Sequence, residues 1–186
     1  MTISINQFKS GLTIIVGGEV YSIVDYEHVK PGKGSAFCRT RLRNLKTGQV
    51  LERTFRDGEK IEEAYVEEKK LQFLYRTPEE LHFMDLEDYN QFSLPVQDLR
   101  GKDQFLKEGL EIKGLFYSQQ LLGVELPTFV ELKVQHTEPG FKGDTVKSGY
   151  KSAALETGAV IQVPLFIEIG DTIKIDTRNG QYVERV

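Results

Sequence analysis

Lys33 has the surroundings most suggestive of chemistry, because it stands between two glycines in the segment Pro31-Gly32-Lys33-Gly34. Proline and glycine bend a chain sharply, so the long cationic side chain should project into solvent at the tip of a turn. An amine in that position is accessible to a modifying enzyme. An ordinary hairpin turn that happens to contain a lysine explains these four residues equally well.

The residues that follow favour a role in binding RNA. Arg39, Arg41 and Arg43 stand two positions apart, so a strand would present all three guanidinium groups on one face, where they could contact several phosphates. From residue 28 to residue 46 the chain carries six basic side chains, Lys30 among them, and no Asp or Glu. This local positive patch predicts an RNA-facing surface beside the exposed lysine.

No constellation in the sequence supports catalysis or metal binding. His28, His82 and His136 are far apart along the chain, and none has a second histidine at a metal-binding spacing. Residues 32–35 lack the upstream glycine and the Lys-Ser pair of a phosphate-binding loop, and no serine nucleophile elbow or zincin helix occurs. We therefore expect a protein that is not an enzyme and that uses no metal and no cofactor.

Two further candidates lie near the C-terminus. Gly143, Asp144 and Thr145 belong to a polar loop whose glycines permit close approach to another backbone. Tyr182 and Arg185 lie three residues apart close to the chain end. By themselves they could equally be a packing tyrosine and a solvated arginine.

The elements that must position these residues are short strands. Gly17-Gly18 readily adopts the positive φ of a tight turn between two β-branched runs, so the chain should open with a hairpin. Only residues 96–107 can hold a short helix. Many short strands with almost no helical segment between them are typical of closed β-barrels. The expected strands are 12–16, 20–24, 35–45, 49–56, 71–75, 81–84, 110–117, 121–126, 129–134, 160–167, 172–176 and 182–186.

Composition limits the class of protein. With 39% hydrophobic and 28% charged residues the chain can bury real cores. It has no apolar run of the ~20 residues that a membrane helix needs, and it opens without a secretory signal, so we expect a cytoplasmic protein with no membrane partner. Cys38 is the only cysteine, which excludes an internal disulfide. The net charge of −4 is distributed unevenly along the chain, because residues 64–126 hold twelve acidic side chains and only seven basic ones.

Two motifs are similar to those of the bacterial elongation factor P family, and the similarity extends along essentially the whole chain. Residues 28–37, His-Val-Lys-Pro-Gly-Lys-Gly-Ser-Ala-Phe, resemble the family's modified-lysine loop and lead into the same basic strand. The second motif resembles the family's C-terminal signature. It comprises Lys151, Ala153, Gly158, Ile161, Val163, Pro164, Ile167, Gly170 and the run Ile175-Asp176-Thr177-Arg178.

The resemblance implies a fold. It is all-β, with three small β-barrels in an L-shaped, tRNA-like arrangement. The N-terminal barrel would be KOW/SH3-like, and the other two would be OB-type. We place the three domains at residues 1–63, 64–126 and 127–186. Residues 94–110 match no family motif, so their role stays open.

The resemblance also implies a function. The protein would be a monomer that binds the ribosome between the peptidyl and exit sites, beside peptidyl-tRNA, and relieves stalling at consecutive prolines. Lys33, modified by a separate enzyme with a β-lysyl or aminopentanol group, would approach the peptidyl-transferase centre. Lys30, Arg39, Arg41 and Arg43 would contact tRNA or ribosomal RNA. Residues 143–145, Tyr182 and Arg185 would face messenger RNA and the small subunit.

Two alternatives remain open at this stage. One is a paralogue of elongation factor P with the same architecture. The other is a general RNA-binding protein with OB-type barrels, which would bind free RNA without any dependence on stalled ribosomes.

Overall fold

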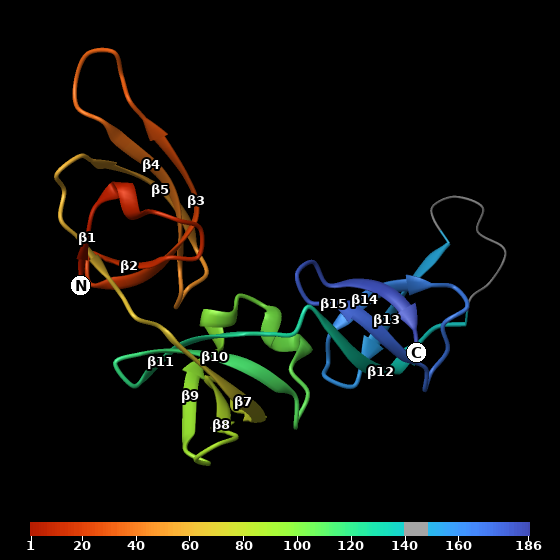
Figure 1. Cartoon of the computed structure of the whole chain (residues 1–186). Helices are drawn as coiled ribbons and strands as arrows, with labels where there is room; N and C mark the ends of the chain where they lie inside the picture. Colours follow the sequence, from red (N-terminus) through yellow and green to blue (C-terminus); the bar gives the residue numbers. More distant parts are fainter. Residues whose placement is uncertain (140–148) are drawn as a thin grey trace. The chain divides into compact units, whose positions relative to one another are not determined.

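The computed structural model describes residues 1–139 and 149–186 (Figure 1). Regular structure in these residues consists of β-strands and three short 3-10 helices, without an α-helix. None of the described helices is long and apolar enough to cross a membrane. The strands form three sheets, which confirms the prediction of an all-β chain.

The N-terminal sheet has six strands in the order β1-β6-β2-β3-β4-β5. A tight turn at Gly17 and Gly18, with φ of 60° and 85°, joins β2 to β3 as expected for the opening hairpin. Inside, Phe8 packs edge-on against Phe55 at 5.3 Å between ring centroids. The elements are β1 (Thr2–Ile3), the 3-10 helix η1 (Ile5–Gln7), β2 (Thr13–Val16), β3 (Glu19–Val29), β4 (Phe37–Asn44), β5 (Val50–Arg56) and β6 (Ile61–Glu63).

The second sheet has five strands in the order β11-β10-β7-β8-β9. Its interior includes Leu71 and Leu81, which are fully buried, and the rings of Phe73 and Phe83, which lie 5.7 Å apart. The strands are β7 (Glu67–Arg76), β8 (Glu80–Asp85), β9 (Gln91–Pro95), β10 (Glu111–Tyr117) and β11 (Gln120–Glu125).

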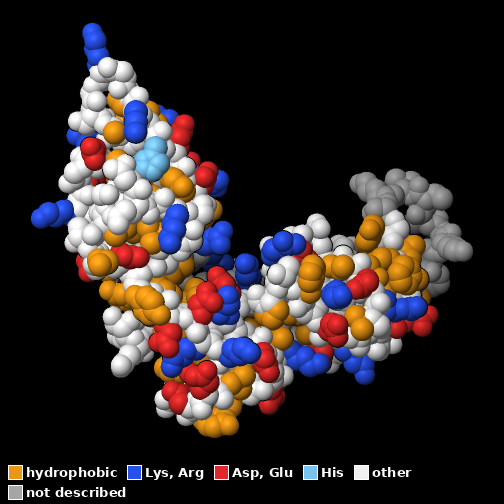
Figure 2. All heavy atoms as spheres, viewed as in Figure 1, with side chains coloured by type: hydrophobic (Ala, Val, Ile, Leu, Met, Phe, Trp, Pro, Cys, Tyr) orange, Lys and Arg blue, Asp and Glu red, His pale blue; other side chains and the backbone are white. Residues whose placement is uncertain are grey.

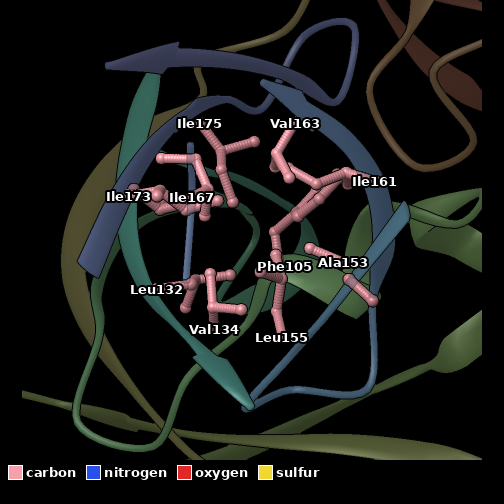
Figure 3. Packing of buried hydrophobic residues seen from close by; sticks show 12 residues of the cluster. Phe105, Leu132, Val134, Ala153, Leu155, Ile161, Val163, Ile167, Ile173 and Ile175 are labelled. Atoms are coloured by element: carbon pink, nitrogen blue, oxygen red, sulfur yellow. The ribbon is translucent and has the colours of Figure 1, made fainter. Parts of the chain in front are cut away.

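The third sheet has five strands in the order β14-β13-β12-β15-β16 and curls around an apolar core (Figure 3). Sequence patterning did not predict β13, because Ser152, Ala153 and Ala154 lack the β-branched or aromatic character by which strands are recognised. The strands are β12 (Phe129–Thr137), β13 (Tyr150–Leu155), β14 (Val160–Pro164), β15 (Thr172–Asp176) and β16 (Gln181–Arg185).

The segment expected to hold one short helix contains two 3-10 helices instead, η2 (Val96–Leu99) and η3 (Lys102–Phe105). Arg100 and Gly101 separate them with positive φ values of 50° and 83°. Two consecutive residues with left-handed backbone conformation cannot continue a right-handed helix, so the single expected helix does not form.

Contacts between residues divide the chain into two compact units. One comprises Met1–Lys69, Gln97–Leu99 and Gly114–Val124, and the other comprises Lys70–Val96, Arg100–Lys113 and Glu125–Val186. Residues 100–113 therefore group with the C-terminal sheet. The three-domain division at Glu63 and Leu126 stays a prediction.

Candidate functional site

The loop that carries Lys33 closes the hairpin of β3 and β4. Pairing between these strands ends where Val29 lies opposite Phe37, so residues 30–36 form the loop (Figure 1). Lys30 and Lys33 are both exposed. The structure therefore places the amine of Lys33 at an accessible hairpin end, as the proline and glycines predicted.

The two glycines of this loop have different roles. Gly34 has φ of 110°, a conformation that side chains rarely adopt, and the Cγ atom of Pro31 lies 3.8 Å from the position of an added Cβ. Gly32 has an ordinary backbone conformation, and an added Cβ there would meet no described atom within 4 Å. The bend thus depends on Gly34, whereas Gly32 leaves open space beside Lys33.

Strand β4 alternates between buried and exposed side chains. Cys38, Thr40 and Leu42 point inward, with exposed fractions of 0%, 2% and 0%. Arg39, Arg41 and Arg43 occupy the alternate, exposed positions. The period-two prediction for the three arginines is confirmed, because the buried set fixes which face of the strand meets the core. We call the exposed set the arginine face.

Acidic residues flank the arginine face, which the sequence patch did not predict. Arg41 lies opposite Asp25 of β3 on one side and Glu52 of β5 on the other. Arg39 lies opposite Glu27 of β3. Residues directly opposite each other in an antiparallel sheet share a face.

The third arginine has different neighbours. Arg43 is opposite Ser22 of β3 and Val50 of β5, so neither directly opposing residue is acidic. Among the described residues, no ion pair within 4 Å engages any of the three guanidinium groups. Figure 2 shows basic and acidic side chains interspersed over the visible surface of the N-terminal part of the chain.

A bulge decides which side chains stand beside the arginines. The register of β3 against β4 shifts between Ile23 and Asp25, so Val24 has no partner in β4. Without that extra residue Val24, in place of Asp25, would lie opposite Arg41. The alternation of charged residues in β3 and β5 was a signal for the acidic neighbours, but the register could not be inferred from it.

A shallow hollow of about 400 Å³ lies on the arginine face. Its described lining includes Arg39 and Arg41 together with Asp25, Glu27 and Glu52. The guanidinium of Arg39 also lies 5.6 Å from the centroid of the Phe37 ring. The arrangement presents cations to a ligand while the neighbouring carboxylates restrict where a phosphate can be placed.

The C-terminal candidates are only partly described. Gly143, Asp144 and Thr145 lie outside the described residues. Tyr182 is half-buried against the core of the third sheet, opposite Ile175, and Arg185 is exposed, opposite Ile173. The register of β15 against β16 shifts at Val183, which has no partner in β15. Tyr182 and Arg185 therefore share a face of the strand although they lie three residues apart.

Arg185 also has described partners. Its Nη1 atom is 3.5 Å from Asp171 Oδ2, and its guanidinium lies 5.7 Å from the Phe166 ring centroid. Tyr182 is therefore in part a packing residue, while Arg185 keeps an exposed cationic group at the edge of the sheet.

Asp176 organises the turn between β15 and β16. Its carboxylate accepts hydrogen bonds from the Nη2 atom of Arg178 at 2.6 Å and from the backbone N–H of Arg178 at 2.9 Å. These two bonds from Arg178 lower the pKa of Asp176 to about 2. The motif Ile175-Asp176-Thr177-Arg178 thus has a structural explanation, since Thr177 also donates its hydroxyl to the carbonyl of Pro127 at 2.7 Å.

Residues 94–110 acquire a role that sequence reasoning missed. Phe105, at the end of η3, is 3% exposed and lies among the buried residues of the third sheet (Figure 3). Lys107 Nζ lies 3.0 Å from Glu156 Oε1, which also accepts a hydrogen bond from the backbone N–H of Lys133. Burial opposes ionisation of Glu156, yet these bonds lower the pKa of Glu156. The apolar pair Phe105-Leu106 within a polar stretch was the available signal.

Three family models together match most of the chain. The model of the elongation factor P KOW-like domain matches residues 4–61, that of the elongation factor P OB domain matches 66–124, and that of the elongation factor P C-terminal domain matches 130–185. The KOW-like and OB-type barrels expected from the sequence are therefore confirmed.

Relatives of similar length extend this result. A protein from Moorella thermoacetica named elongation factor P is 55% identical over 183 residues, covering 98% of this chain and 99% of the relative. One of the same name from Natranaerobius thermophilus is 54% identical over 184 residues, covering 99% and 98%. A structure titled eukaryotic translation initiation factor 5A from Methanococcus jannaschii shares the fold, with a TM-score of 0.54 and 23% identity over 68% of this chain and 92% of that one.

Proposed function

The chain belongs to the elongation factor P family of translation factors, and on that premise we propose that it binds the ribosome between the peptidyl and exit sites and relieves stalling at consecutive prolines. The observation that carries this proposal is the exposed Lys33 at the end of a hairpin whose adjoining strand presents three arginines. A translation factor of this kind assists a reaction that the ribosome catalyses, so the chain itself is not the enzyme.

Lys33 acts by positioning. Proline is a constrained and poorly reacting secondary amine, and nascent prolines hold the peptidyl ester in an unproductive pose. Contacts from Lys33 to the backbone of the tRNA acceptor end lower the entropy cost of reaching a reactive geometry. Bond formation is left to ribosomal RNA, and Lys33 serves as an effector rather than as a general base.

A covalent group on Lys33 extends its reach. The exposed loop and the open space beside Gly32 support access by a separate lysine-modifying enzyme, because a bulky catalytic site must close around the target amine. A β-lysyl or aminopentanol adduct adds polar groups without using any cofactor. The chain would act as a monomer in the cytoplasm, where ribosomes translate.

The arginine face and Lys30 anchor this unit to tRNA or ribosomal RNA through phosphates. Arg43 is the best placed of the three arginines, because neither of its directly opposing residues is acidic. Residues 143–145, Tyr182 and Arg185 are proposed to face messenger RNA and the small subunit. Arg185 supports that role most directly, since its side chain is half exposed, at 52%.

The decisive experiment is reconstituted translation of two reporters, one with a run of prolines and one without. The protein is added in modified form, in unmodified form and as Lys33→Ala, with Lys60→Ala as the control because Lys60 is an exposed lysine of the same compact unit. We expect faster synthesis only of the proline reporter, greatest with modified protein and absent with Lys33→Ala. Equal stimulation of both reporters would favour a general RNA-binding protein instead.

A further inference from the structure

The C-terminal sheet carries a pocket of about 670 Å³ whose described lining includes Tyr182, which the proposed function turns towards messenger RNA, so a ligand bound there would deepen that function. Strands β14 and β16, at opposite ends of the sheet order, both contribute to it and lie near each other across the seam of the barrel. Residues of η3, of the turn before β16 and Tyr150 of β13 complete the described lining. All of these residues belong to one compact unit.

The described polar side chains of the lining are neutral. Four carboxamides line the pocket, from Gln104, Gln162, Asn179 and Gln181, and no described lining residue is charged. Each carboxamide offers an acceptor oxygen and two N–H donors. An ionised ligand would lose hydration here without gaining a counter-charge, so the pocket favours an uncharged polar group.

Aromatic side chains, together with Val160 and Ile161, supply most of the remaining surface. Tyr150 is 55% exposed and Tyr182 is half-buried, while Phe105 closes the pocket from the core side. Gly180 keeps this region open, because a Cβ at that position would lie 3.2 Å from Phe105 Cζ. A planar ligand can therefore lie against a ring while its edge reaches the carboxamides.

Hydrogen bonds within the protein orient several of these amides. Gln162 donates from Nε2 to Ser152 Oγ at 2.8 Å, which turns its carbonyl oxygen away from that contact. Asn179 accepts from the backbone N–H of Gln181 at 2.9 Å. Among the described residues, no hydrogen bond engages the side chain of Gln104. The pocket thus combines carboxamides that are oriented by hydrogen bonds within the protein with the carboxamide of Gln104, which is available to a ligand.

We propose that this pocket binds an unpaired nucleobase of single-stranded RNA. A base is planar and uncharged, stacks on aromatic rings, and carries donors and acceptors along its edge. Asn and Gln side chains pair with the donor and acceptor that adenine presents side by side, so adenine is the base expected to bind best. An extended peptide is the competing ligand, because it would pair with the outer edges of β14 and β16.

The test uses full-length protein labelled with ¹⁵N, titrated with a single-stranded RNA of six adenosines. A strand of equal length and charge that lacks bases is the ligand control. We expect the side-chain amide signals of the lining residues to shift with the adenosine strand and to stay in place with the abasic strand. Equal shifts with both strands, or the same shifts with an uncharged extended peptide, would overturn the proposal.

Variants separate stacking from folding. Tyr150→Ala should weaken adenosine binding roughly tenfold, as expected for loss of one stacking partner, whereas Tyr150→Phe should retain it. Tyr89→Ala is the matched control, because Tyr89 is an exposed tyrosine of the same compact unit. Unchanged affinity of Tyr150→Ala, or an equal loss in Tyr150→Phe, would contradict the assignment.

Salt dependence and the Lys33→Ala variant separate a failure of base binding in the pocket from a failure of the proposed function. Because no described lining residue is charged, the factor lost by Tyr150→Ala should be the same at low and high salt. Lys33→Ala should bind the adenosine strand normally while losing proline rescue. Failure of adenosine binding in wild-type protein that still rescues proline synthesis would therefore reject the pocket and leave the proposed function intact.

Discussion

At the scale of single residues, Lys33 is the side chain on which the proposed activity depends. Lys33→Ala should abolish proline rescue while changing the free energy of unfolding by no more than about 0.5 kcal/mol, as expected at an exposed loop position. Translation kinetics and urea unfolding measure the two effects. Peptide mass spectrometry of protein from its native cell should also find added mass on Lys33. Full activity of the alanine variant would refute the role.

The paired glycines beside Lys33 provide a test of loop geometry. Gly34→Ala forces a side chain into a backbone conformation that costs roughly 1–2 kcal/mol, so the loop should change its path and proline rescue should fall. Gly32→Ala meets no described atom and should be the less harmful of the two. Rescue rates of the two variants, measured at equal protein concentration, make the comparison. The reverse order would show that the bend depends on Gly32.

Asp176 should make stability depend on pH in the acid range. Its folded pKa of about 2 lies below the ordinary 3.8, so its ionised form stabilises the folded state at every pH above the ordinary value. That contribution is lost as pH falls from 3.8 towards 2. The difference in urea midpoint between wild type and Asp176→Asn should therefore be constant near neutral pH and shrink below about pH 4. A difference that persists unchanged to pH 3 would assign the stabilisation to another group.

At the scale of elements, the hairpin of β3 and β4 joins Lys33 to its anchoring surface. A strand of alternating side chains holds three cations on one face at fixed spacing, which a flexible loop could not do. The flanking acids make these cations unequal, so the face is better described as a patterned surface than as a uniform positive patch.

The unequal surroundings of the three arginines predict that they contribute unequally to ribosome binding. Neutralising Arg39, Arg41 and Arg43 together should weaken ribosome binding, most at low salt. The slope of log affinity against log salt should fall by roughly 0.7 to 0.9 for each phosphate contact removed. Among single alanine variants, Arg43→Ala should weaken ribosome binding most. Arg41→Ala should weaken it least, because Arg41 lies between Asp25 and Glu52. A triple variant with the wild-type salt slope and normal rescue would remove the arginines from the mechanism.

At the scale of the whole molecule, residues 100–113 share a compact unit with the C-terminal sheet. Phe105→Ala should lower the free energy of unfolding by about 3–5 kcal/mol, because it leaves a cavity in that core. Phe166→Ala is the control, since Phe166 is 59% exposed, and it should cost far less. Urea unfolding followed by circular dichroism measures both variants. Equal effects would mean that Phe105 contributes little to the core.

The sequence by itself determined the features that depend on local geometry. Strand alternation placed the three arginines on one exposed face, and proline with glycine placed Lys33 at an accessible hairpin end. Agreement with family motifs at many offsets was enough to indicate the KOW-like and OB-type barrels. The first two inferences succeeded because neighbouring residues are sufficient to decide strand alternation and chain bends, whereas the barrel types rested on resemblance to the family.

Only the tertiary structure decided which residues from distant segments meet. Asp25 faces Arg41 because one bulged residue shifts the register of β3, and a shift of one position exchanges the two faces of a strand. Phe105 reaches the core of a sheet whose first strand begins at Phe129, and the amide-lined pocket gathers residues 104, 162, 179 and 181. Such meetings depend on the packing of whole elements, so no local pattern in the sequence could reveal them.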